Sequence, residues 1–302
     1  MEKANKVAEY GSPIQKCHLV PVSQITLIKN KDGQVRYGGL STCRNSWACP
    51  ICTPRRASER AEIVSGIARQ IVNTPVMVTY TLQHKRGDDL NDLLNTLQMA
   101  LRVARNGSRL AAYNRYCLGY IRALEITYGH ANGWHPHYHE LNFLNRGMTM
   151  EGMTKTVIKS YRKAIEKSGR VINEFTVDCK PWDQTTDYLT KGMELTKELT
   201  HGRLKDNGKS LNIFDILDMV GSGSPNNYNS LYAEYVKATH RRKVIVTSRS
   251  LDKWRLIAEE RAKQDKEDGE KDDKIIGVLT RKEFKDISKA GLRLEILVKL
   301  SD

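Results

Sequence analysis

The chain has 302 residues, of which 39% are hydrophobic and 28% charged, a composition that excludes an intrinsically disordered chain. Its 49 Lys and Arg against 35 Asp and Glu give a net charge of +14, which favours a polyanionic partner, nucleic acid first and an acidic membrane surface second. No run approaches the roughly 20 apolar residues of a membrane span, and residues 1–13 contain no apolar secretory segment. We therefore expect a cytoplasmic protein with no membrane partner, in whose reducing surroundings spaced cysteines hold metal more often than they form disulfides.

Hydrophobic periodicity predicts the elements of the central region, since alternation is typical of strands and steps of three and four are typical of helices. In chain order these are a strand at 75–84, a helix at 88–105, strands at 119–128 and 134–144, a helix at 150–167, a strand at 171–178 and a helix at 183–199. The turn-like residues 129–133 join two of the strands into a hairpin. This order predicts an α+β fold with a mainly antiparallel sheet.

Three of the eight histidines lie within five residues, at His135, His137 and His139. Side chains two residues apart in a strand lie on one face, about 7 Å apart, so the three imidazoles point towards one possible ion. In either of two even hairpin registers, Glu125 lies opposite His137 or His139 and faces the same side. Two imidazoles and one carboxylate would leave open positions on an octahedral ion. The alternative is a solvated polar strand face.

A cysteine-rich segment precedes the predicted sheet. Cys43, Cys49 and Cys52 follow Cys17 at spacings that fit a closed, tetrahedral, structural zinc site. Bound thiolates would hold together a region too rich in loops to bury its own core. His18 is the alternative fourth ligand, although Cys17 is favoured because it completes a Cys₄ set. Ordinary buried cysteines, the other alternative, fit this spacing poorly.

Tyr188 and Lys191 lie three residues apart on the helix predicted at 183–199, so they share a face. A phenol has a pKa near 10 and is a poor nucleophile until a cation or metal favours its oxyanion, and Lys191 could supply that charge. The pattern is common in half-buried helices and gains weight only beside the metal site. Tyr161 is the rival nucleophile, but it lies on the apolar stripe of the helix at 150–167, where a core role suits it better.

Together these residues resemble the replication initiator proteins of bacterial rolling-circle plasmids, which are HUH (His-hydrophobic-His) endonucleases. The resemblance runs from Cys17 to about residue 255. Its motifs are the cysteine block within 38–52, a strand of alternating threonines at Thr79 and Thr81, the pair of segments 124–127 and 132–139 with the acidic ligand at Glu125, the tyrosine motif at 188–191, and a C-terminal block within 234–249.

The resemblance implies a central antiparallel β-sheet flanked by helices, the HUH endonuclease fold, with an N-terminal zinc-binding segment. It implies that Glu125, His137 and His139 hold a catalytic Mg²⁺ or Mn²⁺, while His135 orients a ligand or contacts phosphate and Zn²⁺ is structural. Tyr188 would nick one DNA strand and keep its 5′ phosphate, and Lys191 would support it.

The implied partners are plasmid origin DNA, single-stranded at the nick, and host helicase, polymerase and single-strand-binding protein. Some family members carry a glutamate four residues before the tyrosine, which activates water at termination. Gln184 stands there in this chain, so Asp183 or Asp187 must act instead, or termination differs.

Four regions are expected: a zinc-binding region at 1–70, a nicking and joining core at 71–205, a helical block at 206–262, and a charged linker with a small extension at 263–302. Three other functions fit part of the pattern. A relaxase or single-strand transposase would share the metal and the tyrosine. A non-enzymatic zinc-containing DNA-binding regulator would give the histidine strand no function. A metallohydrolase would give Tyr188 no function.

Overall fold

The computed structural model describes residues 2–7, 12–73, 75–170, 176–181, 210–222 and 227–301. A five-stranded sheet forms its centre, with the strand order β6-β3-β5-β4-β7. All four strand pairs are antiparallel. The strands are β6 (Val177–Pro181), β3 (Pro75–Tyr80), β5 (Gly133–Leu144), β4 (Cys117–Gly129) and β7 (Ile245–Thr247). The predicted α+β class and the hairpin between the two longest strands are confirmed.

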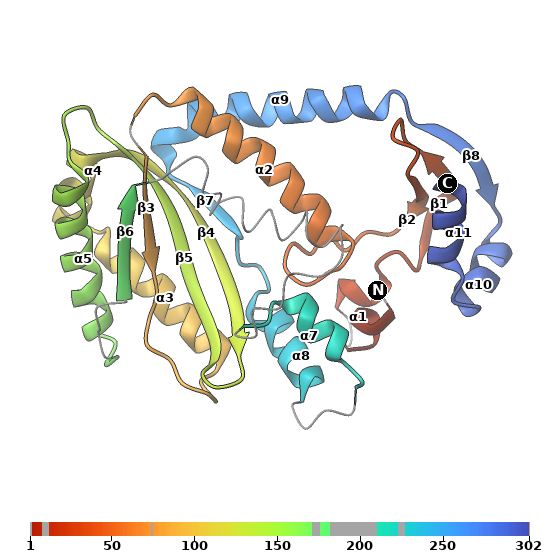
Figure 1. Cartoon of the computed structure of the whole chain (residues 1–302), viewed down its shortest axis with the longest axis horizontal. Helices are drawn as coiled ribbons and strands as arrows, with labels where there is room; N and C mark the ends of the chain where they lie inside the picture. The colour runs from red at the N-terminus through yellow and green to blue at the C-terminus, as the bar shows by residue number, and fades with distance from the viewer. Residues whose placement is uncertain are drawn as a thin grey trace.

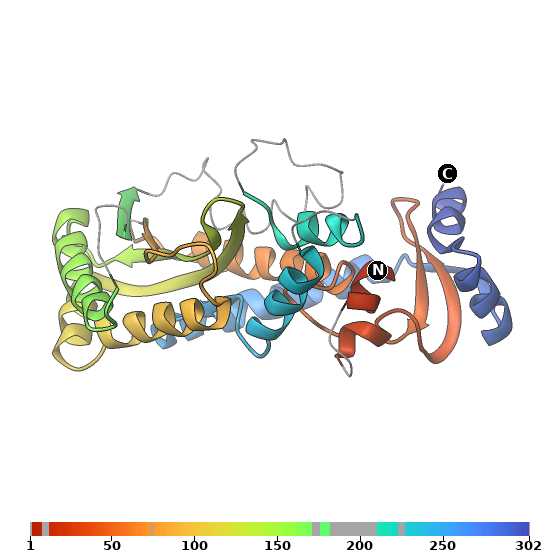
Figure 2. The same ribbon diagram turned by 90° about the horizontal axis from the view of Figure 1, so that it is seen from below.

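Helices cover both faces of this sheet. The first face packs on α3 (Leu90–Ala104), α4 (Ser108–Tyr116) and α5 (Met150–Glu166), and Figure 2 shows α3 running along it. Part of the second face packs on α2 (Cys52–Gln70) and α9 (Asp252–Glu270). Apolar residues recur along α3 and α5 at helical spacing, and Asp89 and Thr149 cap their first turns through side-chain oxygens.

A smaller group of helices connects the cysteine-rich segment to the sheet. It consists of α1 (Glu2–Val7), the short 3₁₀ helix η1 (Pro13–Lys16), α7 (Ile213–Met219) and α8 (Tyr228–Ala238). Their buried side chains join Trp47 and the first-face core in one continuous hydrophobic cluster. The cysteine-rich segment is therefore packed against the central sheet's own core.

The two ends of the chain meet in a second sheet with the order β2-β1-β8. It contains β1 (Pro21–Lys29), β2 (Val35–Leu40) and β8 (Lys274–Leu279), and it packs on α10 (Arg281–Lys289) and α11 (Arg293–Ser301). Helices α2 and α9 lie side by side and connect this unit to the central sheet, as Figure 1 shows. Helix α9 follows the 3₁₀ turn η3 (Arg249–Leu251) and includes residues 263–270 of the expected linker.

Several boundaries differ from the sequence prediction. The strand expected at 75–84 ends at Tyr80, which pairs with Tyr138. Two positions further along, the same register would pair Leu82 with Pro136, whose ring nitrogen has no hydrogen to donate to that strand. Of the strand expected at 171–178, residues 171–175 lie outside the described residues, and β6 covers Val177–Pro181. The helix expected at 183–199 also lies outside the described residues. Within the described ranges, no helix combines the length and apolar character that a membrane crossing requires.

Candidate active site

The β4–β5 hairpin brings Glu125 onto the histidine face. Glu125 pairs directly with His137, which is one of the two even registers expected from the sequence, and His139 pairs with Thr79 of β3 on its other side. The Oε2 atom of Glu125 lies 3.1 Å from Nε2 of His137 and 3.1 Å from Nε2 of His139. The three side chains thus converge from two neighbouring strands on one point.

This donor set fits a divalent ion. In an octahedral site with ligands about 2.1 Å from the metal, adjacent ligand atoms lie about 3.0 Å apart, close to the two 3.1 Å separations around Glu125. Burial raises the pKa of Glu125, but hydrogen bonds from His137 and His139 outweigh it and hold that pKa well below its ordinary value. The carboxylate is therefore ionised and ready to act as a ligand.

Two threonines of β3 and its extension were singled out by the sequence. Thr79 shares a hydrogen bond of 3.1 Å with Nδ1 of His139, so the opposite ring nitrogen, Nε2, faces Glu125. Hydrogen bonds of this kind set the tautomer and orientation of metal-binding imidazoles. Thr81 lies one residue past the end of β3, where its backbone N–H donates to the carbonyl oxygen of Thr176 at 3.0 Å.

His135 lies beside this group and is paired with His84, which the sequence analysis missed. Nδ1 of His135 is 2.6 Å from Nε2 of His84, and Nδ1 of His84 is 3.0 Å from the carbonyl oxygen of Asn132. A proton on each Nδ1 satisfies both contacts and leaves Nε2 of His135 as an acceptor. Burial, with repulsion from His137 and His84, lowers the pKa of His135 to about 4. No local pattern marks His84, because its partner is 51 residues away.

The cysteine group is closed and lies apart from the histidine group. Sγ of Cys17 is 3.7 Å from Sγ of Cys52 and 3.6 Å from that of Cys49, while Cys43 is 3.7 Å from Cys52. A tetrahedral zinc with bonds of about 2.3 Å needs sulfur–sulfur edges of about 3.8 Å. The structure gathers Cys17 with the other three cysteines, and His18 is not part of this group.

Hydrogen bonding within this group favours a thiolate. The side chains of Cys17, Cys43 and Cys49 lower the pKa of Cys52, because each stabilises a negative charge on its sulfur. None of the six cysteines forms a disulfide, so all four sulfurs of this group are available as ligands. The loop from Cys43 to Cys49 therefore has the donors for a structural ion at both of its ends.

A family model described as replication protein matches residues 35–290. The chain belongs to this replication protein family. A curated relative named Protein rep, from Streptomyces lividans, is 25% identical over 51% of the chain and 40% of its own length. A protein from Streptomyces cyanogenus named Neomycin resistance protein is 32% identical over 34% of the chain and 30% of its own length. The chain thus spans less than half of either relative, and no solved structure matches it.

The expected nucleophile, Tyr188, lies outside the described residues, as do Lys191, Asp183 and Asp187. The rival, Tyr161, is fully buried on α5, where its hydroxyl donates to the carbonyl oxygen of Thr81 at 3.0 Å. Burial raises its pKa far above the ordinary value for a tyrosine. Tyr161 is therefore the core residue that its apolar stripe indicated.

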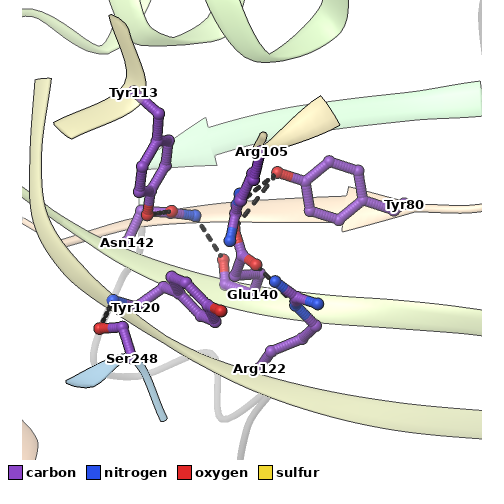
Figure 3. Close-up of polar contacts among 8 residues, drawn as sticks. All are labelled: Tyr80, Arg105, Tyr113, Tyr120, Arg122, Glu140, Asn142 and Ser248. Carbon is purple, nitrogen blue, oxygen red and sulfur yellow. Dashed lines mark hydrogen bonds and ion pairs between the residues drawn. The ribbon is translucent and has the colours of Figure 1, made fainter. Parts of the chain in front are cut away.

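Behind the histidines, on the first face of the sheet, the chain buries a charged network (Figure 3). Glu140, next to His139 in β5, is completely buried and forms ion pairs with Arg105 of the α3 terminus and Arg122 of β4. Tyr80 also donates to this carboxylate, at 3.2 Å. The network ties β3, β4 and β5 together directly beneath the candidate ligands.

Proposed function

We propose that this chain is a rolling-circle plasmid replication initiator that nicks one strand of origin DNA and stays attached to its 5′ end. The observation that carries the proposal is the convergence of Glu125, His137 and His139 on one point, in a chain of the replication protein family. The net charge of +14 suits a protein that binds DNA largely through phosphates. The proposed partner is plasmid origin DNA, with host helicase, polymerase and single-strand-binding protein acting after the nick in the cytoplasm.

The residues divide the work as follows. Glu125, His137 and His139 would hold Mg²⁺ or Mn²⁺, which supplies positive charge to the phosphate oxygens as negative charge develops. Thr79 fixes the ring of His139 through its Nδ1 hydrogen bond. His135, held by His84, presents an uncharged ring nitrogen beside the ion ligands and contacts phosphate or orients a ligand.

The proposed nucleophile is Tyr188. Its phenol oxygen forms a bond to the scissile phosphorus, and the bond from phosphorus to the 3′ oxygen breaks. The phenol proton is lost, the 3′ oxygen gains a proton, and the phosphodiester energy is kept in the phosphotyrosine. Lys191 supplies positive charge to the phenolate. Asp183 or Asp187 would activate the water or strand that ends the cycle, since Gln184 carries no acid.

We further propose that Cys17, Cys43, Cys49 and Cys52 hold one structural zinc. Their mutual spacing of 3.6–3.7 Å and the thiolate on Cys52 support this assignment. A zinc with four protein sulfurs has no open position for substrate, so its contribution is to the fold.

A denaturing gel tests the proposal. Full-length protein, Mn²⁺ and a labelled single strand from the plasmid origin should give a protein–DNA adduct that survives boiling in detergent. Tyr188→Phe keeps the ring and removes one oxygen, so it should bind the strand and form no adduct. Tyr161→Phe, the matched control, should form the adduct normally.

Each rival predicts a different gel. Cleavage without an adduct would indicate a metallohydrolase, and binding without cleavage would indicate a regulator. Adduct formation only with an unrelated transfer or transposon end would indicate a relaxase or transposase. An adduct on Tyr188→Phe equal to that of the unchanged protein would refute the nucleophile assignment.

A further inference from the structure

A cavity of about 100 Å³ opens beside the candidate ion ligands, at the edge of β4. Glu125 and His139 are among the residues that line it. The rest of its wall comes from neighbouring residues of β4, the cysteine loop, α2, the start of α7, Tyr235 of α8 and the first residue of β7 with the one before it. The cysteine-rich segment thus forms part of a space that reaches the candidate active site, beyond any role in folding.

Three aromatic side chains line the cavity, those of Trp47, Phe214 and Tyr235. Trp47, within the loop between Cys43 and Cys49, donates from its indole Nε1 to the carbonyl oxygen of Arg242 at 2.9 Å, and its ring meets Tyr235 edge-on at 6.3 Å. The backbone N–H of Phe214 donates to Oδ1 of its helix-capping residue Asn212 at 2.7 Å, which fixes the start of α7 beside the cavity. Because the ring of Trp47 is already anchored, little side-chain entropy is lost when a flat ligand packs against it.

The wall also carries one cation that has no protein partner among the described residues. Arg60 of α2 lines the cavity and, within the described part of the chain, makes no ion pair or hydrogen bond of its own. Burial and repulsion from Arg56 lower its pKa to about 10, whereas Arg56 itself donates to Oγ of Ser46 at 3.1 Å. Arg60 is only partly buried, so water can reach its guanidinium, and its donors are available to a ligand that enters the cavity.

We propose that this cavity holds one nucleobase of the substrate strand, next to the phosphate that is cut. The inference rests on the proposed nicking function and adds a subsite to it. A base has apolar faces that suit Trp47 and Phe214, and acceptor atoms on its edge that suit the donors of Arg60. A simple anion would leave the aromatic walls unused, and an aliphatic ligand would leave Arg60 unpaired.

Binding of single-stranded origin oligonucleotides tests the subsite without relying on cleavage. Each oligonucleotide carries one abasic position, moved stepwise across the nick, and binding is measured without added Mg²⁺ or Mn²⁺. One abasic position should weaken binding by about ten- to a hundredfold, the usual effect of losing one stacked base. The other positions should change binding far less. Equal binding to every abasic oligonucleotide would overturn the proposal.

Filling the cavity gives the decisive comparison. Ala57 lines it and is 8% exposed, so Ala57→Phe should weaken binding to the complete strand and remove the difference between complete and abasic strands. Ala112→Phe, on the exposed side of α4, is the matched control and should keep that difference. If the difference persists in Ala57→Phe, the base lies elsewhere and the proposal is wrong.

A second variant covers the case in which Ala57→Phe does not fold. Arg60→Gln should reduce the abasic effect, while Arg69→Gln, an exposed arginine on the same helix, should not. If the unchanged protein forms no adduct but its binding still depends on the abasic position, the phosphotyrosine chemistry is refuted and the subsite is supported. If it forms the adduct but binds every abasic oligonucleotide equally, the chemistry is supported and the subsite is refuted. Competition by free mononucleotides without any position dependence would assign the cavity to another ligand and overturn the proposal.

Discussion

Glu140→Gln should strongly destabilise the protein although Glu140 touches no substrate. Glu140 is fully buried, and the side chains of Arg105 and Arg122 are only 9% and 12% exposed. The substitution keeps the shape but leaves two buried guanidinium groups without a counter-charge. Removing one member of a buried ion pair typically costs about 3–5 kcal/mol. At about 2–4 °C per kcal/mol, the thermal midpoint should fall by roughly 10 °C.

Thermal unfolding followed by circular dichroism measures this change. Glu151→Gln, which breaks the solvent-exposed pair with Lys155, is the matched control and should leave the midpoint unchanged. Replacing Arg105, Arg122 and Glu140 together by apolar residues removes all the charges, so that variant should be more stable than Glu140→Gln alone. Equal midpoints for Glu140→Gln and Glu151→Gln would refute the buried-charge reasoning.

The same network predicts a pH dependence. Burial alone would raise the pKa of Glu140, but Arg105 and Arg122 outweigh it and hold that pKa below its ordinary value. Its stabilisation is therefore complete above the unfolded-state pKa of about 4.3 and is lost as pH falls through the lower folded-state pKa. The unchanged protein should lose stability on acidification more steeply than Glu140→Gln, which has no carboxyl to titrate there.

Three further predictions concern the two candidate metal groups. Purified protein should contain about one tightly held zinc per chain, measured by metal analysis. Cys49→Ser should lower the zinc content and the yield of folded protein before it lowers specific activity. Undenatured protein without zinc would contradict the Cys₄ assignment. Thr79→Val removes the hydrogen bond to His139 and should weaken Mn²⁺ binding, measured by calorimetry, by about 10- to 100-fold. An unchanged Mn²⁺ affinity would argue that Thr79 does not orient His139. His137→Ala should abolish nicking and leave duplex binding largely intact, while chelation should stop nicking by the unchanged protein until Mg²⁺ or Mn²⁺ is restored.

Local periodicity was sufficient for much of the fold. A strand has a period of two, so the spacing of His135, His137 and His139 already placed them on one face. The short turn at 129–133 restricted the hairpin to registers of which one puts Glu125 opposite His137. Helices α3 and α5 were predictable because apolar spacing and capping residues within each segment determine them. Cysteine spacing likewise indicated the four-sulfur group.

Contacts between distant segments were decided only by the tertiary structure. The pairing of β1 with β8 joins opposite ends of the chain, and neither strand carries a signal for its partner. Three features combine residues from separate elements: the pairing of His84 with His135, the cavity beside Arg60, and the buried network of Arg105, Glu140 and Arg122. Which elements meet depends on how the whole chain buries its apolar surface while pairing its buried charges. The free energy gained in this way depends on all the segments together, so it cannot be assigned to any one of them. Sequence periods therefore determined which face of the sheet each candidate ligand occupies, whereas packing determined which side chains orient it.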